Sequence, residues 1–173
     1  MAGQEPAAAG GTHGRGGNRP DRRQEGLSAI ARPDPALLDP ARYPYRQETT
    51  TRFADVDPNR HLNNVALAAM MEDGRVRFNF AIGFREAIAP RRAMVASMGI
   101  EYLAQGYFPD GVEVQAAIES VGRTSFSVIQ LLTQGGRNVA FARSVIVCID
   151  GDAPSPIPDA FRDELLAKWT LRG

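Results

Sequence analysis

The stretch that decides the fold reads RFADVDPNRHLNN, Arg52–Asn64, and VALAAMMEDGRVRF follows it without a break. Residues Asp57–Asn59, the tripeptide DPN, have the composition of a turn, because proline presets the backbone φ angle and Asp and Asn hydrogen-bond their own backbone. Asn63 or Asn64 is a good helix N-cap, since a short amide side chain accepts from the free N–H groups of a first helical turn. The sequence therefore predicts a polar turn that leads directly into a helix.

The residues after Asn64 have the period of an amphipathic helix. Apolar or small residues recur at steps of three and four, which places them on one face: Leu67, Met70, Met71, Gly74 and Phe78. Asp73 and Arg77 have the i,i+4 spacing of an ion pair, and Gly83 is suited to the C-terminal end of the helix. A glycine in the middle of a helix is destabilising, so Gly74 predicts close packing against a sheet or another helix.

Five segments have the composition and alternation of β-strands: residues 46–53, 94–104, 111–120, 124–134 and 137–150. Gly135 and Gly136 form a hairpin turn between the last two. Short connections imply antiparallel neighbours, and residues 137–150 are apolar on both faces, which indicates a central strand. Residues 156–169 contain a short amphipathic helix. One long helix and one antiparallel sheet make an α+β fold, and one helix leaves apolar surface that a second copy of the chain would bury.

The composition of the chain limits its function. With 173 residues, a formal net charge of +0 and 43% apolar residues, it fits one globular domain. A neutral chain lacks the basic surplus of a general nucleic-acid binder. No segment predicts a membrane span, and the N-terminus lacks the apolar stretch of a signal peptide. We therefore expect a cytoplasmic protein with no nucleic-acid and no membrane partner.

The chain has one cysteine, Cys148, in an almost continuous apolar run. One cysteine rules out an internal disulfide framework, and its surroundings predict a buried strand residue. Zinc would need more Cys and His than the sequence offers, so we expect no metal site.

The composition also changes along the chain. From Ala2 to Gly26 no apolar residue larger than alanine or proline occurs, and such a segment cannot bury enough surface to offset its ordering entropy. We predict a disordered tail over residues 1–30, a proline-broken lead-in segment over residues 31–44, and one folded domain over residues 45–173.

The stretch Arg52–Asn64 resembles the hotdog-fold thioesterases, meaning the 4-hydroxybenzoyl-CoA thioesterase superfamily and the related acyl-ACP thioesterases. Their usual form is Arg-Phe/Trp-x-Asp-x-Asp-x-x-x-His-x-Asn-Asn, then a helix with an acidic pair followed by Ala-Arg, where this chain has Glu72–Arg75 (EDGR). The segments IEYLAQGYFPDGVEV and VGRTSFSV extend the resemblance to about residues 45–168. It implies a hotdog fold, in which a five-stranded antiparallel sheet wraps around one long helix, and dimers or tetramers with sites between subunits.

The resemblance also implies an activity, the hydrolysis of an acyl-CoA or acyl-ACP thioester without a cofactor. A carboxylate can attack the carbonyl carbon or take a proton from water, and Asp57 is the candidate. Asn59 and His61 match residues that position the carbonyl group and water in the acyl-ACP branch. In another branch a helix carboxylate is the base; Glu72 or Asp73 corresponds to it, and the choice between branches stays open.

Other residues have binding or structural roles in this interpretation. The helix that begins near Asn64 points free N–H groups and its positive dipole end at the same region, where they can stabilise an oxyanion. Asp55 is expected to be structural. The expected substrate-binding residues are Asn63, Asn64 and Val65 at the helix start, with Arg91, Arg92 and Arg123 for the phosphates of coenzyme A.

Two other functions remain open. Hotdog hydratases and dehydratases typically show Asp-x-Asn-Pro-x-His, with His five residues after Asp; here His61 is four after Asp57, which favours the thioesterase. A non-catalytic acyl-binding protein is the third interpretation. The chain departs from the family pattern at positions that shape the substrate pocket, so the acyl group and its carrier stay undetermined: Leu67 for the usual Tyr, Ala104-Gln105 where proline is expected, and Pro109-Asp110 for Gly-Asp.

Overall fold

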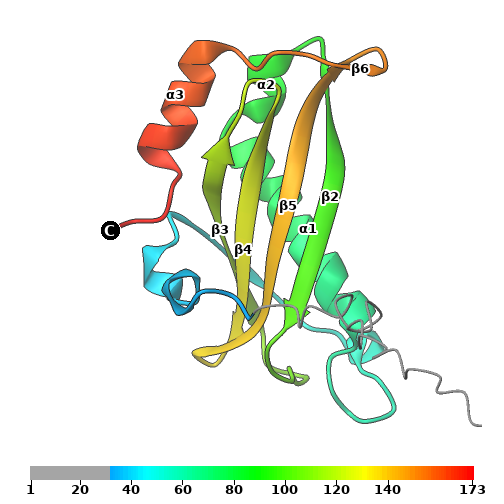
Figure 1. Ribbon diagram of the computed structural model, residues 1–173. Helices are drawn as coiled ribbons and strands as arrows, with labels where there is room; N and C mark the ends of the chain where they lie inside the picture. The colour runs from blue at the N-terminus through cyan, green and yellow to red at the C-terminus, as the bar shows by residue number, and fades with distance from the viewer. Residues whose placement is uncertain (1–31) are drawn as a thin grey trace, which may run out of the picture. The chain divides into compact units, whose positions relative to one another are not determined.

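The computed structural model describes residues 32–173 (Figure 1). The predicted disordered tail over residues 1–30 lies outside the described residues. The lead-in segment contains two short 3-10 turns, Pro35–Leu37 and Pro40–Arg42. The remaining elements, in chain order, are β1 (Tyr45–Thr49), a 3-10 turn at Phe53–Asp55, α1 (Asn64–Ala81), α2 (Phe84–Ile88), β2 (Arg92–Tyr102), β3 (Val112–Val121), β4 (Ser125–Gln134), β5 (Arg137–Asp150), β6 (Ala153–Pro154) and α3 (Asp159–Lys168).

The strands form one antiparallel sheet in the order β1-β3-β4-β5-β2, with the two-residue β6 added beside β5. The long helix α1 packs against one face of this sheet (Figure 1). The predicted α+β hotdog fold, with five main strands and one long helix, is confirmed, and β5 is an interior strand as its apolar faces predicted. None of the helices in residues 32–173 is long and apolar enough to span a membrane.

Two expectations about the elements were wrong, and one helix was not predicted. The first strand ends at Thr49, because Asp55 accepts the Arg52 N–H at 2.8 Å and folds Phe53–Asp55 into a 3-10 turn. The short helix α2 follows α1 directly and was not predicted. Finally, β2 and β3 are consecutive in sequence but lie apart in the sheet, since the segment between them, residues 103–111, crosses from one side of the sheet to the other.

The beginning of α1 follows the prediction. Asn63 is the N-cap, and its side-chain oxygen accepts the Ala66 N–H at 2.7 Å. The predicted apolar face is buried, and Arg75 is buried with it. Asp73 and Arg77 form the predicted i,i+4 ion pair at 2.8 Å. Gly83 follows Ile82, the C-cap of α1, and has a φ of 70°, a left-handed conformation that glycine adopts without strain.

Apolar side chains cover both faces of the sheet. On the inner face α1, α2 and α3 bury residues of β3, β4 and β5, among them the fully buried Cys148, as predicted. On the outer face Tyr43 from the lead-in segment packs with Ala117, Ile129 and Phe141. The Tyr43 hydroxyl donates to the Leu37 carbonyl at 2.7 Å, which ties the lead-in segment to this outer cluster.

The edge strand β2 is the exception, because its residues from Arg92 to Gly99 are all exposed. Large apolar side chains are exposed along β2, and α1 exposes two more toward its C-terminal end. They are Met94, Val95, Met98 and Tyr102 from β2, and Val76 and Phe80 from α1. We call these six residues the β2 face. An exposed apolar group of this kind on an unpaired sheet edge is a surface suited to pairing with another chain.

The distance between α1 and the sheet is set at Gly74. A Cβ atom at this position would lie 2.6 Å from Cγ1 of Val114 on β3, far inside normal contact. The close approach predicted from this mid-helix glycine is therefore confirmed, and it brings the whole helix, including its N-terminal end, close to the sheet.

Replacing Gly74 by alanine should destabilise the protein even though alanine favours helix by about 1 kcal/mol over glycine. Overpacking against Val114 should outweigh that gain and lower the free energy of unfolding by about 1–3 kcal/mol. Urea unfolding of Gly74→Ala, Val114→Ala and the double variant measures the effect. The double variant should recover part of the loss, because its two changes share one contact. A more stable Gly74→Ala protein would show that the helix is free to move outward.

Candidate active site

The Asp57 carboxylate organises the turn before α1. Its Oδ1 atom accepts the backbone N–H of Asn59 at 2.8 Å and that of His61 at 3.1 Å. The Asp57 N–H donates to the His61 carbonyl at 2.8 Å, and the Arg60 N–H donates to the Asp57 carbonyl at 2.9 Å. Asp57 therefore lies at the base of a closed loop whose two ends meet as a bridge between Val56 and Leu62.

Arg60 lies at the tip of this loop with a φ of 65°. The left-handed region is unfavourable for a residue with a Cβ atom, so the conformation persists only where the surrounding bonds enforce it. Here the bonds of Asp57 on both sides of Arg60 enforce it. Sequence alone predicted a turn at Asp57–Asn59, and the loop extends further, to Leu62.

The segment after β2 holds the loop from the other side. The Leu62 N–H donates to the Gly106 carbonyl at 2.8 Å, and a Cβ atom at Gly106 would lie 2.9 Å from Leu62 Cδ1. Tyr107 is fixed in turn by Gln134 of β4, which accepts its N–H at 2.8 Å and donates to its carbonyl at 2.7 Å. The Tyr107 ring meets the His61 ring edge to face, with centroids 5.2 Å apart. The sheet therefore positions His61 through residues 106 and 107.

Asp55 has a structural role, as expected. Its side chain is buried, accepts the Arg52 N–H at 2.8 Å, and pairs with the Arg52 guanidinium at 2.9 Å. The Asp55 carbonyl accepts the Asn63 N–H at 2.9 Å, which fixes the helix cap. The hydrogen bond to Arg52, opposed by burial, holds the pKa of Asp55 below its ordinary value.

A hollow of about 390 Å³ opens beside the loop, and we call it the Asp57 hollow. Three predicted catalytic residues, Asp57, Asn59 and His61, line it together with Asn64, a predicted substrate-binding residue. Leu62 and Leu67 also line it, and the end of β2 with the segment after it supplies the rest of the wall: Tyr102, Leu103, Ala104 and Gln105. The positions that depart from the family pattern at Leu67 and Ala104-Gln105 thus do border the candidate site.

The charge of Asp57 is favoured by its surroundings. The backbone N–H of His61, followed by that of Asn59, lowers the pKa of Asp57 below its ordinary value. The carboxylate is therefore ionised at neutral pH. Its Oδ1 atom is occupied by the turn, whereas Oδ2 has only a long contact of 3.5 Å to the Asn59 amide, so one oxygen keeps its lone pairs available.

The start of α1 borders the hollow at Asn64 and has free hydrogen-bond donors, although Val65, also predicted to bind substrate, does not line the hollow. Ala66 and Leu67 donate their N–H groups to Asn63, whereas those of Asn64 and Val65 have no acceptor among residues 32–173. The Tyr102 hydroxyl donates to the Asn64 carbonyl at 3.1 Å and so ties the end of β2 to the helix start. Two free N–H groups at a positive helix end form a site suited to a negatively charged oxygen.

The helix carboxylates do not border the Asp57 hollow. Asp73 accepts from Arg77 at 2.8 Å and from Gln47 at 3.1 Å, and its bond to Arg77, opposed by burial, lowers its pKa. It lines a separate depression of about 250 Å³ beside Asp55. Glu72 points to solvent with 67% of its side chain exposed. Within one subunit, therefore, the structure does not bring Glu72 or Asp73 to Asp57.

The three arginines expected to bind coenzyme A also lie elsewhere. Arg91 donates to the carbonyl groups of Ile88 and Pro156, and Arg92 donates to the Gly151 carbonyl at 3.1 Å. Both lie near the C-terminal end of α1, and Arg123 is exposed between β3 and β4. No cluster of three or more His, Cys, Asp and Glu side chains that could hold a metal ion occurs within residues 32–173.

Sequence reasoning missed Tyr102 and Tyr107 as site residues. Each lies about 40 positions beyond the residue it contacts, Asn64 for Tyr102 and His61 for Tyr107, and no local pattern marks these contacts. The sequence did offer one signal, the aromatic residues Tyr102, Tyr107 and Phe108. They lie at or near the segment 103–111, which contains positions expected to shape the substrate pocket.

Replacing Asp55 by asparagine should lower the free energy of unfolding at pH 7 by about 1–2 kcal/mol, because a charged hydrogen bond is lost while its partner Arg52 stays in water. Since the folded pKa of Asp55 is lowered, its contribution is present above the unfolded pKa of about 3.9 and is lost as the pH falls through the folded pKa. Denaturant unfolding at several pH values checks this. Asp152→Asn, in the exposed turn before β6, is the matched control and should change little. A difference that persists unchanged at low pH would contradict the charged interaction.

The comparisons with known proteins agree with this geometry. The model of the thioesterase-like superfamily matches residues 51–165, and comparison with curated proteins gave no match. A Thermus thermophilus thioesterase, crystallised with coenzyme A and Zn, is 31% identical, with a TM-score of 0.64 over 73% of this chain and 95% of its own. A predicted thioesterase from Bacillus stearothermophilus is 28% identical, with a TM-score of 0.65 over 75% and 98% of the two chains.

A more distant protein shares the fold. A Staphylococcus aureus protein, solved in complex with CoA, is 17% identical, with a TM-score of 0.65 over 75% of this chain and 85% of its own. The residues that match the family model include the Asp57 loop, all of α1 and the strands β2 to β5. The chain belongs to the thioesterase-like superfamily and has its hotdog fold.

Proposed function

We propose that this protein hydrolyses acyl-coenzyme A thioesters at the Asp57 hollow. The observation that carries the proposal is an ionised carboxylate, Asp57, placed in one hollow with Asn59 and His61 beside the free N–H groups at the start of α1. The Thermus thermophilus relative, whose structure holds coenzyme A, supports this carrier over acyl carrier protein.

The lowered pKa of Asp57 decides which chemistry suits it. A carboxylate that holds a proton poorly is a weak base near neutral pH, but it is present in the charged form that attacks a carbonyl carbon. In the proposed reaction an Asp57 oxygen bonds to the acyl carbon, the C–S bond breaks, and the thiolate leaves and takes a proton from water. A second water then attacks the mixed anhydride, its C–O bond breaks, and the acid leaves as a carboxylate while the Asp57 carboxylate is regenerated. Of the two protons released, one neutralises the hydroxide left by the first water and the other passes to solvent. No cofactor is needed.

The other residues stabilise and orient the reacting groups. The N–H groups of Asn64 and Val65 are donors for the oxygen that becomes negative as the tetrahedral intermediate forms. His61, fixed against Tyr107, and the Asn59 amide border the same hollow and would orient the carbonyl group and the water. Arg91, Arg92 and Arg123 are proposed to meet the phosphates of coenzyme A from a neighbouring subunit, since within one subunit none of the three lines the Asp57 hollow.

We also propose that the protein works as a dimer or a larger homo-oligomer, with the β2 face paired to a second copy. In one subunit this edge strand has no neighbour on its outer side within the described sheet, and it exposes the apolar β2 face. Antiparallel pairing of two β2 strands would satisfy the backbone groups of the edge and cover this face.

A charge on the β2 face should weaken the dimer. Met98 is 37% exposed in the middle of β2, and a glutamate there would be forced into an apolar interface. Sedimentation velocity at micromolar concentration should show a dimer or larger species for the wild type and mostly monomer for Met98→Glu. Leu166→Glu, on the exposed side of α3, is the matched control and should sediment like the wild type. A monomeric, active wild type would refute the shared site.

Replacing Asp57 by asparagine should abolish most of the activity and leave the fold intact. The asparagine oxygen can still accept the N–H groups of Asn59 and His61, but the charge is gone. We expect kcat to fall by about 10²- to 10⁴-fold, with KM changed far less and the melting temperature within a few degrees of the wild type. Thiol release from acetyl-CoA to palmitoyl-CoA is the assay, to which the buried Cys148 should contribute little background. Asn59→Ala and His61→Ala should be impaired less.

The same assay on further variants distinguishes Asp57 from the helix carboxylates, and hydrolysis from binding alone. Asp152→Asn, which removes an exposed carboxylate far along the chain, should keep the wild-type kcat. Full activity of Asp57→Asn together with loss in Glu72→Gln or Asp73→Asn would move the reaction to the helix carboxylates. Acyl-CoA binding without hydrolysis in the wild type would instead identify a non-catalytic acyl-binding protein.

A further inference from the structure

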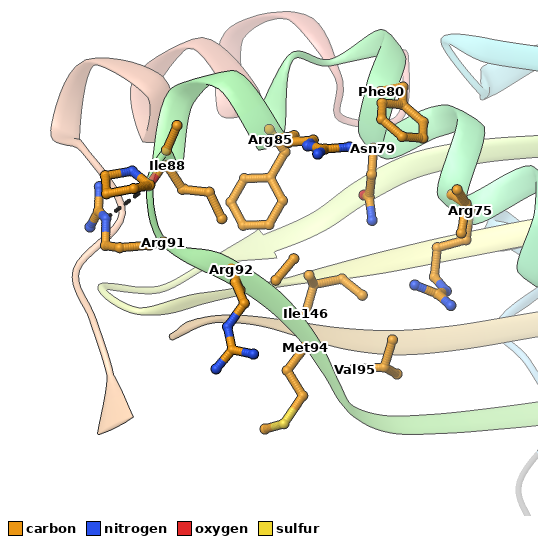
Figure 2. Close-up of a pocket in the computed structure, with 15 residues that line it drawn as sticks. Arg75, Asn79, Phe80, Arg85, Ile88, Arg91, Arg92, Met94, Val95 and Ile146 are labelled. Carbon is orange, nitrogen blue, oxygen red and sulfur yellow. Dashed lines mark hydrogen bonds between the residues drawn. The ribbon is translucent and has the colours of Figure 1, made fainter. Parts of the chain in front are cut away.

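A second and larger cavity lies beside the C-terminal half of α1. It has a volume of about 610 Å³ and lies between α1, α2 and β2 (Figure 2). From Asn64 at the Asp57 hollow to Arg75 the helix advances eleven residues, about 16 Å at its rise of 1.5 Å per residue. Within one subunit this space, which we call the Arg75 cavity, is therefore separate from the Asp57 hollow.

Arg75 is in an unusual position for a cation. Its side chain is 6% exposed, and its Nε–H has no acceptor within the described part of the chain. The one carboxylate near it, Glu72, is 3.5 Å away and largely in water. Burial, only partly offset by Glu72, lowers the pKa of Arg75. A buried guanidinium with an unmade hydrogen bond is destabilising, so its presence calls for an explanation.

Asn79 is one helical turn further along α1 and faces the same space. Its Oδ1 atom is buried and has no partner among the described residues. Figure 2 shows Arg75 and Asn79 reaching from α1 toward β2. Rotation of the amide presents either its oxygen or its NH₂ group to the cavity. Two polar groups four residues apart thus form a recognition point in a cavity whose other walls include the buried, apolar Phe84, Ile88 and Ile146.

The charge of the lining has one sign. Four arginines line the cavity, Arg75, Arg85, Arg91 and Arg92, and no acidic residue does. The hydrogen bonds of Arg91 and Arg92 go to neutral carbonyl and hydroxyl groups and leave their charge unbalanced. An apolar cavity with a few convergent donors is the usual form of a small-molecule site, and a positive lining that contains no acidic residue favours an anion.

We propose that the Arg75 cavity binds the carboxylate of an apolar organic acid, with Arg75 and Asn79 holding the carboxylate and the apolar walls holding the chain. The carboxylate can come from a free acid or from the far end of a dicarboxylic acyl thioester. The second source rests on the proposed function. Antiparallel pairing of two β2 strands places the Arg92 end of one strand beside the partner's Tyr102, which lies at the wall of the Asp57 hollow. The Arg75 cavity of one subunit would then lie near the Asp57 hollow of the other. The exposed Phe80, Met94 and Val95 at the mouth of the cavity would then be covered by the second copy.

Calorimetric titration of the full chain with octanoate and with octan-1-ol tests the carboxylate. Octanoate should bind the wild type at least about tenfold more tightly than octanol, and Arg75→Met should weaken octanoate binding by about ten- to a hundredfold, the worth of a charge-assisted hydrogen bond. Arg46→Met, which removes an arginine paired with Glu113 outside the cavity, is the matched control and should bind like the wild type. Asn79→Leu should also bind octanoate more weakly.

Stability separates a binding role from a structural one. Glu72, the ion-pair partner of Arg75, is largely in water, so replacing Arg75 by an apolar side chain of similar length leaves no unpaired charge buried. Arg75→Met should therefore melt at the wild-type temperature or above it. Equal binding of octanoate and octanol, no octanoate binding, or unchanged octanoate binding by folded Arg75→Met would each overturn the proposal. If Arg75→Met does not fold, unchanged octanoate binding by both Arg75→Lys and Asn79→Leu overturns it.

Hydrolysis assays distinguish the two sources. If the carboxylate belongs to the substrate, Arg75→Met should lower kcat/KM for suberyl-CoA by about ten- to a hundredfold and leave octanoyl-CoA unchanged. If it belongs to a free acid, octanoate binding should depend on Arg75 while both thioesters respond equally to the substitution. Failure to hydrolyse either thioester would refute the proposed function. The octanoate titration would still show whether the Arg75 cavity binds a carboxylate.

Discussion

The arrangement of the candidate site depends on one interaction, the acceptance of the Asn59 and His61 N–H groups by the Asp57 carboxylate. It closes the loop, enforces the left-handed Arg60 and sets the direction in which the chain enters α1. The same bonds keep the carboxylate ionised. Asp57 is therefore both the structural centre of the loop and the group proposed to react. Its Oδ1 atom holds the loop, and its Oδ2 atom is the oxygen available for the reaction.

The position of the loop is fixed by contacts with two parts of the fold that are distant in sequence. Gly106 and Tyr107 fix Leu62 and His61, and Gln134 anchors that segment to the sheet. On the other side, the close approach at Gly74 keeps α1, and with it the free N–H groups of its first turn, against the same sheet. A site built this way is positioned by regular structure rather than by the loop itself, which is what a precise reaction geometry requires.

Local patterns predicted the elements whose causes are local. The helix period and the cap at Asn63 gave α1, and alternation gave the strands of the sheet, with errors at strand ends such as Thr49. The placement of β2 at the sheet edge was not predictable in this way, because it follows from which long-range pairs form and not from the composition of the strand. The same holds for the contact of Tyr102 with the start of α1 and for that of Tyr107 with the loop. The sequence identified Arg75 only as part of the EDGR motif, because the period of a helix does not reveal that a cation on it is buried with one N–H group left without an acceptor.

The most direct test of the central claim, that ionised Asp57 carries thioester hydrolysis, is the pH dependence of kcat/KM for the preferred acyl-CoA, with Asp57→Asn measured alongside as background. A catalytic carboxylate with a lowered pKa predicts a rate that is constant between about pH 5 and 7 and falls only below the ordinary aspartate value of about 3.9. A rate that instead rises through neutral pH, and that Asp57→Asn reproduces, would show that another group with a higher pKa performs the reaction.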